Sequence, residues 1–525
     1  MAMQISEEME REIKGAFYTP EIWVKLSQEY LTESFGENFQ NEYYIWDCAA
    51  GTGNLLHGLT NKYKVWASTL DTQDVAVMHD RISCKNLNLL EEHCFQFDFL
   101  KDGFEKLPKN LRTIIEDPQK REKLIIYINP PYAEAGQSRS MSGTGKHKPG
   151  VATKKEINKK YNEDIGNASN EIFALFLTRI YNEIPNCKIA EFSTLKTLMA
   201  PNFEKFREFF RAKLKKCFIV PSYSFDNVTG EFPIGFKIWD IEKKEKFKKI
   251  RAEVYDEKGK KIQNKKISLN INQKYINDWL RQYYDKKNPS IGILYNNKND
   301  FQTCRQVRID SLDTKDHSTP ITKKNLIVAC IYFAVRHSIE ETWINNRDQF
   351  LFPNDKWKND RKFLGNCLIF VLFHGQNRIS FKYGTNHWIP FAECDIEAKN
   401  NFESHFMSDF IAGEEILQAR EPKLKSLFEE NELEKLLKPI FGTQAKKVLK
   451  AGQELYKYYH NQPNANVNAS FYNIREYFQG TKNGRMNNKS SDEKYNELLK
   501  KLRIEMDLLS KEIKPKIYEY EFLEE

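Results

Sequence analysis

The apolar run at residues 124–128, Leu-Ile-Ile-Tyr-Ile, ends at the tetrapeptide Asn-Pro-Pro-Tyr. A β-rich run that is stopped by two prolines predicts a buried strand that cannot continue past its carboxyl end. In doubly wound α/β folds, ligands bind in the crevice beyond these strand ends. The Asn129 amide oxygen accepts hydrogen bonds, Pro130 and Pro131 stiffen the backbone, and Tyr132 offers a flat face for stacking. The combination suits a planar amine, although four such residues alone also fit an ordinary loop.

A second segment, residues 44–54, has the pattern of a ligand-binding strand and turn. Its sequence, Tyr-Ile-Trp-Asp-Cys-Ala-Ala-Gly-Thr-Gly-Asn, predicts a strand, a glycine-bearing turn and then a helix. Gly51 and Gly53 allow close backbone approach, and the helix start offers amide donors to a carboxylate. Asp47 lies just before the turn. A Gly-x-Gly pair alone would also fit a nucleotide site or a simple turn.

Two further acids follow predicted strands. Residues 65–71 read as a second strand that ends at Asp71, about 20 residues after the glycine turn, where a carboxylate can accept both ribose hydroxyls. Residues 95–100 alternate like a third strand, with Asp98 near its end. Either acid alone fits a solvated turn. Their order between the two stronger motifs favours a cofactor site.

The segment Gly-Ala-Phe-Tyr-Thr-Pro at residues 15–20 precedes a helical pattern. Thr19 is predicted to cap this helix, with Pro20 at its first position. Capping is sufficient to explain the Thr-Pro pair when it is considered alone.

Taken in order, Phe-Tyr-Thr-Pro, Asp-x-x-x-Gly-x-Gly, two strand-end acids and Asn-Pro-Pro-Tyr form a specific set. The set resembles the S-adenosylmethionine-dependent N6-adenine DNA methyltransferases of the gamma-type motif order. The resemblance implies an α/β protein with a Rossmann-like methyltransferase fold and a mixed seven-stranded sheet. It implies S-adenosyl-L-methionine as cofactor, no metal, and methyl transfer to N6 of an adenine flipped out of double-stranded DNA. Ala49 departs from the family, which often carries a larger apolar or aromatic residue there.

The resemblance also assigns roles to individual residues. The residues expected at the cofactor are Phe17, Tyr18, Thr19, Pro20, Asp47, Ala49, Gly51, Gly53, Asn54, Asp71, Asp98, Phe99 and Asn129. The expected catalytic residues are Asn129, Pro130, Pro131, Tyr132 and Phe232. In the family, the acid corresponding to Asp98 takes the adenine amine of the cofactor and Phe99 flanks the ring. Phe232 is expected to stack the substrate base against Tyr132, with Phe225 as the rival.

Residues 137–160 are rich in Gly, Ser and Lys, with seven Lys or Arg against one acid. Low apolarity predicts a mobile loop, and a passive insertion is the alternative. Because the segment follows the catalytic tetrapeptide, we expect a lid that contacts DNA phosphates. The expected phosphate contacts are Lys146, Lys148, Lys154, Lys155, Lys159 and Lys160.

The length of 525 residues predicts two or three domains. The resemblance covers about residues 15–240, and composition becomes Lys- and Glu-rich from Asp240, as in a solvated hairpin or linker. We therefore expect a catalytic domain at 1–240, an α+β DNA target-recognition region at 241–400 and a mainly helical region supporting DNA binding at 401–525. Net charge of +8 and 13% aromatic residues weakly favour a polyanion with stackable bases.

Other sequence features bear on cellular location and on disulfide and metal sites. No run of 18 apolar residues and no signal-peptide core is present, and the nine cysteines are scattered without paired histidines. We expect a cytoplasmic protein, bacterial or phage-encoded, with neither disulfide framework nor metal site, and with a cognate restriction endonuclease as a further partner.

Three classes of protein fit the sequence less well than a stand-alone DNA methyltransferase, and a fourth fits it equally well. An N-methyltransferase of RNA or of a protein glutamine shares the tetrapeptide, but seldom carries some 280 further residues. A catalytically idle binding subunit is opposed by the intact motifs. A fused restriction enzyme is opposed by the 14 residues before the first motif and by the lack of a nuclease pattern. A modification subunit of a larger restriction-modification complex stays open.

Overall fold

The computed structural model describes residues 18–132, 154–226, 228, 230–270, 274–312, 317–413, 438–483 and 485–524, with side chains left out at 154–159. The chain divides into two compact units. The first comprises Met1–Gln273 with Thr342–Arg347, and the second comprises Lys274–Glu341 with Asp348–Glu525.

The first unit is built on a nine-stranded sheet with the order β3-β2-β1-β4-β5-β7-β6-β8-β9. Its strands are β1 (Tyr44–Asp47), β2 (Val65–Thr69), β3 (Cys94–Gln96), β4 (Leu124–Ile128), β5 (Lys188–Thr194), β6 (Ala212–Pro221), β7 (Pro233–Lys244), β8 (Lys249–Tyr255) and β9 (Lys261–Ser268). The strands from β3 to β5 are parallel, and β7 lies antiparallel between β5 and β6. The predicted Rossmann-like α/β fold is confirmed, but the expected count of seven strands is wrong.

The two additional strands place the end of the first unit later in the chain than the domain boundary expected at residue 240. β7 continues through that position, and β8 and β9 form the solvated hairpin that the Lys- and Glu-rich composition predicts. β8 pairs with β6, so the hairpin extends the sheet instead of linking two domains. The first unit consequently runs on to Gln273.

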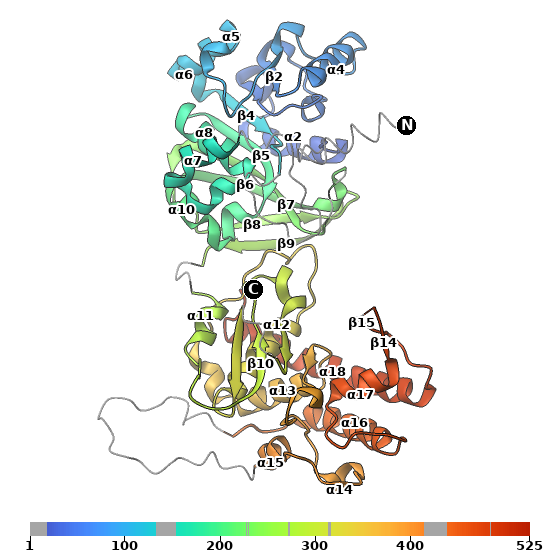
Figure 1. The fold of residues 1–525 in the computed structure, drawn as a ribbon. Helices are drawn as coiled ribbons and strands as arrows, with labels where there is room; N and C mark the ends of the chain where they lie inside the picture. Colours follow the sequence, from blue (N-terminus) through green and yellow to red (C-terminus); the bar gives the residue numbers. More distant parts are fainter. Residues whose placement is uncertain are drawn as a thin grey trace, which may run out of the picture. The chain divides into compact units, whose positions relative to one another are not determined.

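Helices cover both faces of this sheet, as alternation along β4 requires. Leu124, Ile126 and Ile128 pack with α5 (Lys109–Glu116), α8 (Ile172–Glu183) and α10 (Glu204–Phe209). Ile125 and Tyr127 point to the opposite core, with α2 (Glu21–Phe35) and α4 (Thr72–Ser83). Figure 1 shows α7 (Lys154–Ile165), α8 and α10 together on one side of the sheet. The other helices are α3 (Phe39–Glu42), α6 (Pro118–Glu122) and α9 (Lys196–Met199).

Three local predictions differ from the structure. The helix expected after the glycine turn is a single 3₁₀ turn, η1 (Asn54–Leu56). The third strand ends at Gln96, before the expected residues 97–100. The expected loop over 137–160 is helical from Lys154 onward, where α7 begins.

The second unit combines a four-stranded sheet with helices around one core. The sheet order is β12-β10-β11-β13, formed by β10 (Ser290–Tyr295), β11 (Arg308–Asp310), β12 (Ser318–Thr322) and β13 (Asn377–Arg378). The helices are α11 (Ile276–Arg281), α12 (Leu326–His337), α13 (Arg361–Leu372), α14 (Glu393–Ile396), α15 (Phe406–Ala412), α16 (Thr443–His460), α17 (Phe471–Gln479) and α18 (Glu493–Glu519). A short hairpin, β14 (Thr481–Lys482) with β15 (Arg485–Met486), follows α17.

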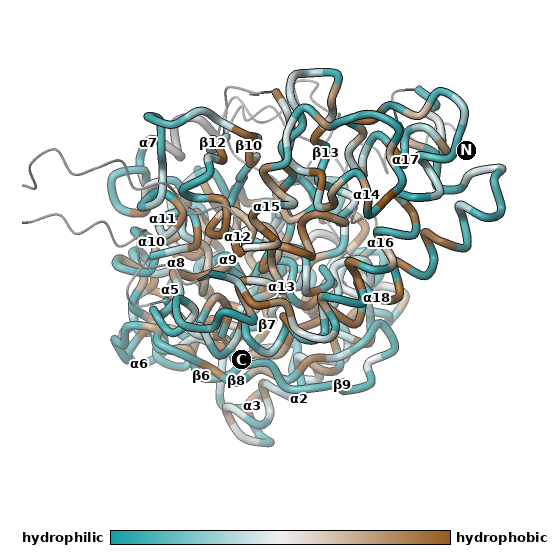
Figure 2. Tube along the Cα trace, turned by 90° about the horizontal axis from the view of Figure 1, so that it is seen from below, coloured by the Kyte–Doolittle hydropathy of each residue, from teal (hydrophilic) through white to brown (hydrophobic). Residues whose placement is uncertain are grey.

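A single apolar cluster unites this unit. It includes residues from Ile276 to Leu523, so the expected division near residue 400 does not separate two cores. α12 is buried along nearly its whole length, and Figure 2 shows that its residues are mostly hydrophobic. The second unit therefore contains both the expected α+β part and the expected helical part, and the two parts share one hydrophobic core.

Among the described residues, every helix is too short or too polar to cross a bilayer.

Candidate functional site

The strand order of the first unit reverses between β1 and β4, so a topological switch point lies at the carboxyl ends of these two strands. From β1 the chain proceeds to β2 and β3 on one side, and then returns to β4 on the other. Asp47 ends β1, Asn129 directly follows β4, and Asp71 lies two residues after β2. Since the three strands are parallel, these residues lie at the same edge of the sheet. Ligands of doubly wound folds bind at such a switch point.

The turn after β1 uses its glycines in two different ways. Gly51 has φ +52°, and a Cβ placed on it would meet no protein atom within 4 Å. Gly53 has φ +81°, and a Cβ there would lie 2.9 Å from Leu87. At Gly53, both the positive φ and the close contact with Leu87 therefore require a glycine. At Gly51, the space beside the backbone is open. That open space fits the approach of a cofactor to the turn.

Asp47 is buried, with 1% of its surface exposed. Its Oδ1 accepts a hydrogen bond from the Ala49 amide at 3.0 Å. Burial outweighs this bond and raises the pKa of the Asp47 carboxyl to about 8. A cationic ligand group near the carboxyl would favour its ionised form.

An arginine that the sequence gave no reason to select fixes the same turn. Arg81, on α4, donates from Nη1 to the Thr52 carbonyl and to Asn54 Oδ1, each at 2.5 Å. Burial lowers the pKa of the Arg81 guanidinium. Asn54 thus has a structural partner in addition to its predicted place at the cofactor, and α4 is tied to the glycine turn.

Asn129 is held at both ends of its amide. Nδ2 donates to Thr19 Oγ1 at 2.9 Å, and Oδ1 accepts from the Tyr132 hydroxyl at 2.6 Å. Thr19 was predicted to cap α2, but the helix begins at Glu21 with Pro20 as its N-cap and has no side-chain cap. The capping prediction is wrong because the Thr19 hydroxyl faces Asn129 instead. The structure brings these two predicted motifs together, and Tyr18 and Pro20 flank the contact along the chain.

Tyr132 packs against the cores on both faces of the sheet. Burial raises the pKa of its phenol, and the negative charge of Glu191 adds to this. Glu191 lies on β5 and is fully buried, 3.2 Å from the equally buried Lys237 ammonium on β7. Lys237 also donates to Ser193 Oγ at 2.7 Å. A buried ion pair therefore supports the strand end beside Tyr132, and nothing in the sequence pattern singled it out.

Asp98 and Phe99, predicted at the cofactor adenine, lie beyond β3. Asp98 Oδ1 accepts from the Leu100 amide at 3.1 Å, which closes a local turn. The Phe99 ring is 2% exposed and stacks on Phe176 with a centroid separation of 5.0 Å. One face of Phe99 is thus covered by the core. The roles of Asp98 and Phe99 at the cofactor stay predictions.

The structure distinguishes the two aromatic candidates for the substrate base. Phe225 is 2% exposed and packs against Phe192 in the core, whereas Phe232 is partly exposed. β7 runs antiparallel to β5 with Thr194 opposite Ile234, so Phe232 lies beyond the carboxyl end of β5. This is the same edge of the sheet that Asn129 occupies. Phe232 is therefore the better placed of the two.

A residue distant in sequence covers Phe232. The Arg347 guanidinium lies 5.5 Å from the centre of the Phe232 ring. Arg347 belongs to Thr342–Arg347, the segment from the second half of the chain that joins the first unit. Its neighbour Trp343 packs edge-on against Tyr223, and Lys265 on β9 donates to the Ile344 carbonyl at 3.0 Å.

The structure describes only some of the remaining residues that were predicted to bind cofactor or DNA. Phe17, Lys146 and Lys148 lie outside the described residues, as do the side chains of Lys154, Lys155 and Lys159. Lys160 is exposed and lies 3.5 Å from Glu183, so its charge is shared with an acid. In the described part of the chain, no three His, Cys, Asp or Glu side chains are grouped as a metal site would require.

No family model and no curated protein matches this sequence. Among solved structures, the chain is similar to the DrdV–DNA complex at 15% identity and a TM-score of 0.36, over 55% of this chain and 33% of that chain. It is similar to the type IIG restriction endonuclease BpuSI at 18% identity and a TM-score of 0.31, over 46% and 27% of the two chains. A type I restriction-modification methyltransferase subunit from Streptococcus thermophilus gives 17% identity and a TM-score of 0.30, over 49% and 51%. The chain spans between about a quarter and a half of the length of each of these proteins.

Proposed function

We propose that this protein is an S-adenosylmethionine-dependent DNA methyltransferase that modifies N6 of adenine. The observation that carries the proposal is the position of Asn129. Its amide lies directly after β4, held by Thr19 and Tyr132, at the switch point that Asp47 and the glycine turn also border. A rigid hydrogen-bonding group at a switch point, with open space beside the Gly51 backbone, fits what methyl transfer to an amine requires.

The cofactor would be held by the strand ends. S-adenosyl-L-methionine supplies an electrophilic methyl group when it is bound. The Gly51 backbone would leave room for it, Asp47 would lie near its amino-acid portion, and the Asp71 carboxylate would accept the ribose hydroxyls. The buried Asp47 carboxyl gains a favourable partner in the cofactor ammonium. No metal is part of this proposal.

The Asn129 amide would act on the substrate amine. An exocyclic amine of adenine is a weak nucleophile because its lone pair is delocalised into the ring. Asn129 Oδ1 and the Pro130 carbonyl each accept one N–H of that amine, which draws the nitrogen toward tetrahedral geometry. A carbonyl oxygen has two acceptor positions, so Oδ1 can bind the amine while it keeps the Tyr132 hydroxyl. Pro131 keeps the loop rigid.

The adenine must leave the duplex to reach this position, because its amine is used in base pairing. Tyr132 and Phe232 are proposed to stack on the flipped base, and the Arg347 guanidinium beyond Phe232 adds positive charge to this edge. The second unit is proposed to recognise DNA sequence, with double-stranded DNA as substrate and a restriction endonuclease as functional partner. Action within a larger restriction-modification complex is compatible with the same chemistry.

Methyl-transfer assays with labelled S-adenosylmethionine test this proposal. The purified chain should label duplex DNA, and digestion of the product to nucleosides should yield N6-methyladenine. RNA and total protein serve as competing substrates in parallel reactions. Labelling of RNA or of protein glutamine without DNA, or a DNA product that is N4-methylcytosine, would contradict the proposal.

A further inference from the structure

The hairpin β14–β15 presents polar and basic side chains on a short two-stranded ribbon. Thr481 pairs with Met486 and Lys482 pairs with Arg485. Asn483 follows β14 with φ +53°, as in the tight turns that an Asn-Gly sequence favours. Residues 480–491 contain three Lys or Arg, three Asn and no acid. The ribbon therefore combines positive charge with amide groups.

The base of the hairpin is fixed to the helices of the second unit. The Asn487 amide nitrogen donates to the Gly480 carbonyl at 3.0 Å, and its side chain donates to the Gln479 carbonyl at 2.8 Å. Gln479 is buried, and its Oε1 accepts from the Tyr495 hydroxyl of α18 at 2.9 Å. Ser490 donates to the Phe478 carbonyl of α17 at 2.6 Å. These contacts give the ribbon a defined direction relative to both helices.

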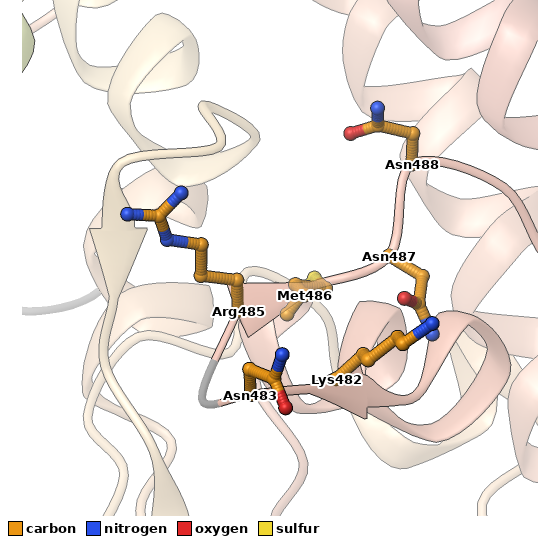
Figure 3. Close-up of a pocket in the computed structure, with 6 residues that line it drawn as sticks. All are labelled: Lys482, Asn483, Arg485, Met486, Asn487 and Asn488. Carbon is orange, nitrogen blue, oxygen red and sulfur yellow. The ribbon is translucent and has the colours of Figure 1, made fainter.

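Four side chains of the hairpin and its continuation are exposed and available to a ligand. Within the described part of the chain, Lys482, Asn483, Arg485 and Asn488 make no side-chain hydrogen bond or ion pair, and all four are exposed. Figure 3 shows Arg485 and Asn488 extending to either side of an open space above Met486. This hollow measures about 650 Å³ and is lined by Lys482, Asn483, Arg485, Met486, Asn487 and Asn488.

We infer that the β14–β15 hairpin enters the major groove of DNA and reads base edges through Arg485 and Asn488. The major groove of B-DNA admits a two-stranded ribbon. There, Arg pairs with O6 and N7 of guanine and Asn pairs with N6 and N7 of adenine, each with two hydrogen bonds. Lys482 contacts phosphate and positions the ribbon. The inference rests on the proposed function and names the element that selects the modified sequence.

Other partners match the hairpin less well. Protein interfaces are centred on buried aromatic or apolar anchors, whereas Met486 is the only apolar residue at 480–491. The major groove of A-form RNA is too deep and narrow for side chains to read. Duplex DNA is therefore the partner that agrees with both the shape and the chemistry of the ribbon.

The test compares site preference among full-length variants on a duplex library with randomised sequence. Modified bases are located by sequencing after limited methylation. Arg485→Ala should relax the preference at one or two fixed positions flanking the modified base by about tenfold, as should Asn488→Ala at a different position. Arg503→Ala is the matched control, because Arg503 is exposed on α18 outside the hairpin and loses the same charge. It should preserve the wild-type preference.

The possible outcomes distinguish base-specific contacts from phosphate contacts, and both of these from a failure of the proposed function. If Arg485→Ala weakens binding to all duplexes equally and keeps the wild-type preference, the hairpin holds phosphates and the inference is overturned. The same holds if Arg503→Ala relaxes the preference as much as Arg485→Ala does. A wild-type chain that methylates no DNA in the library gives a distinct result, and it overturns the proposed function together with the inference. Thermal unfolding of each variant verifies that the exposed substitutions preserve the fold.

Discussion

The Asn129 side chain donates a hydrogen bond to Thr19 Oγ1 at 2.9 Å across 110 positions of sequence. The other end of the amide accepts from Tyr132 at 2.6 Å. With both ends bound, the amide has one orientation and its oxygen points in a fixed direction. A group that is oriented before the substrate arrives loses little in reorganisation when the reaction occurs.

Replacing Thr19 by Val should slow methyl transfer while the side-chain shape is kept. The Asn129 amide then loses its acceptor, and a neutral hydrogen bond of this kind contributes about 0.5–1.5 kcal/mol, or about twofold to tenfold in rate. Single-turnover transfer at saturating cofactor measures the effect. Thr19→Ser keeps the hydroxyl and should restore most of the rate. Equal rates for the Val and Ser variants would show that the hydroxyl does not orient Asn129.

Asn129→Ala removes the proposed acceptor itself and should have a much larger effect. Loss of one positioned polar group in an active site costs on the order of 100-fold to 1000-fold in rate. Cofactor affinity and fold should largely persist, which calorimetry and thermal unfolding measure. Tyr132→Phe is the matched control, since it removes the hydroxyl that contacts Asn129 but keeps the ring for stacking. Because Tyr132→Phe removes only one of the two hydrogen bonds that orient the amide, it should slow transfer much less than Asn129→Ala does. Transfer by Asn129→Ala at close to the wild-type rate would show that this amide does not act on the substrate amine.

Asp71→Ala should weaken S-adenosylmethionine binding tenfold or more. Asp71 lies just after β2, and hydrogen bonds from ribose hydroxyls to a carboxylate contribute about 1.5–3 kcal/mol. Titration calorimetry of the full chain gives the affinity. Asp80→Ala removes the same charge from an exposed position on α4 and should bind the cofactor as the wild type does. Unchanged affinity of Asp71→Ala would reject the ribose contact.

The parts of the site that follow local pattern could be predicted from sequence. Strands that end at Asp47 and just before Asn129 are marked by apolar runs and by glycine or proline, which act over a few residues. The edge of the sheet could not be predicted. β8 and β9 bury few side chains and lie in a segment rich in Lys and Glu, and this composition also fits a linker. Only the pairing of β8 with β6, and of β9 with β8, shows that the sheet continues.

Contacts between distant segments leave no local signal. The Thr19 hydroxyl fits a helix cap equally well until Asn129 is seen beside it, and Arg347 lies on Phe232 from more than 100 residues away. These contacts also change how the domains should be tested. A truncation at Asp240 would cut through β7 and remove Thr342–Arg347 from the first unit. Point substitutions on the intact chain are therefore the sound test of recognition.

Asp47 should make stability fall as pH rises. Its pKa is about 8 in the folded chain because of burial, against an ordinary value of 3.8. Between these values the native state keeps a proton that the unfolded state has released, so each added pH unit costs up to about 1.4 kcal/mol. Asp47→Asn has no such proton.

The measurement is thermal unfolding of the cofactor-free chain at several pH values from 4.5 to 8.5. The melting temperature of Asp47→Asn should rise relative to the wild type as pH increases through this window, and the two should approach each other at its acid end. Asp80→Asn, on the exposed face of α4, should follow the wild type throughout. A difference between Asp47→Asn and wild type that is constant with pH would mean that Asp47 is already ionised in the fold. In that case it would need a charged partner before the cofactor arrives.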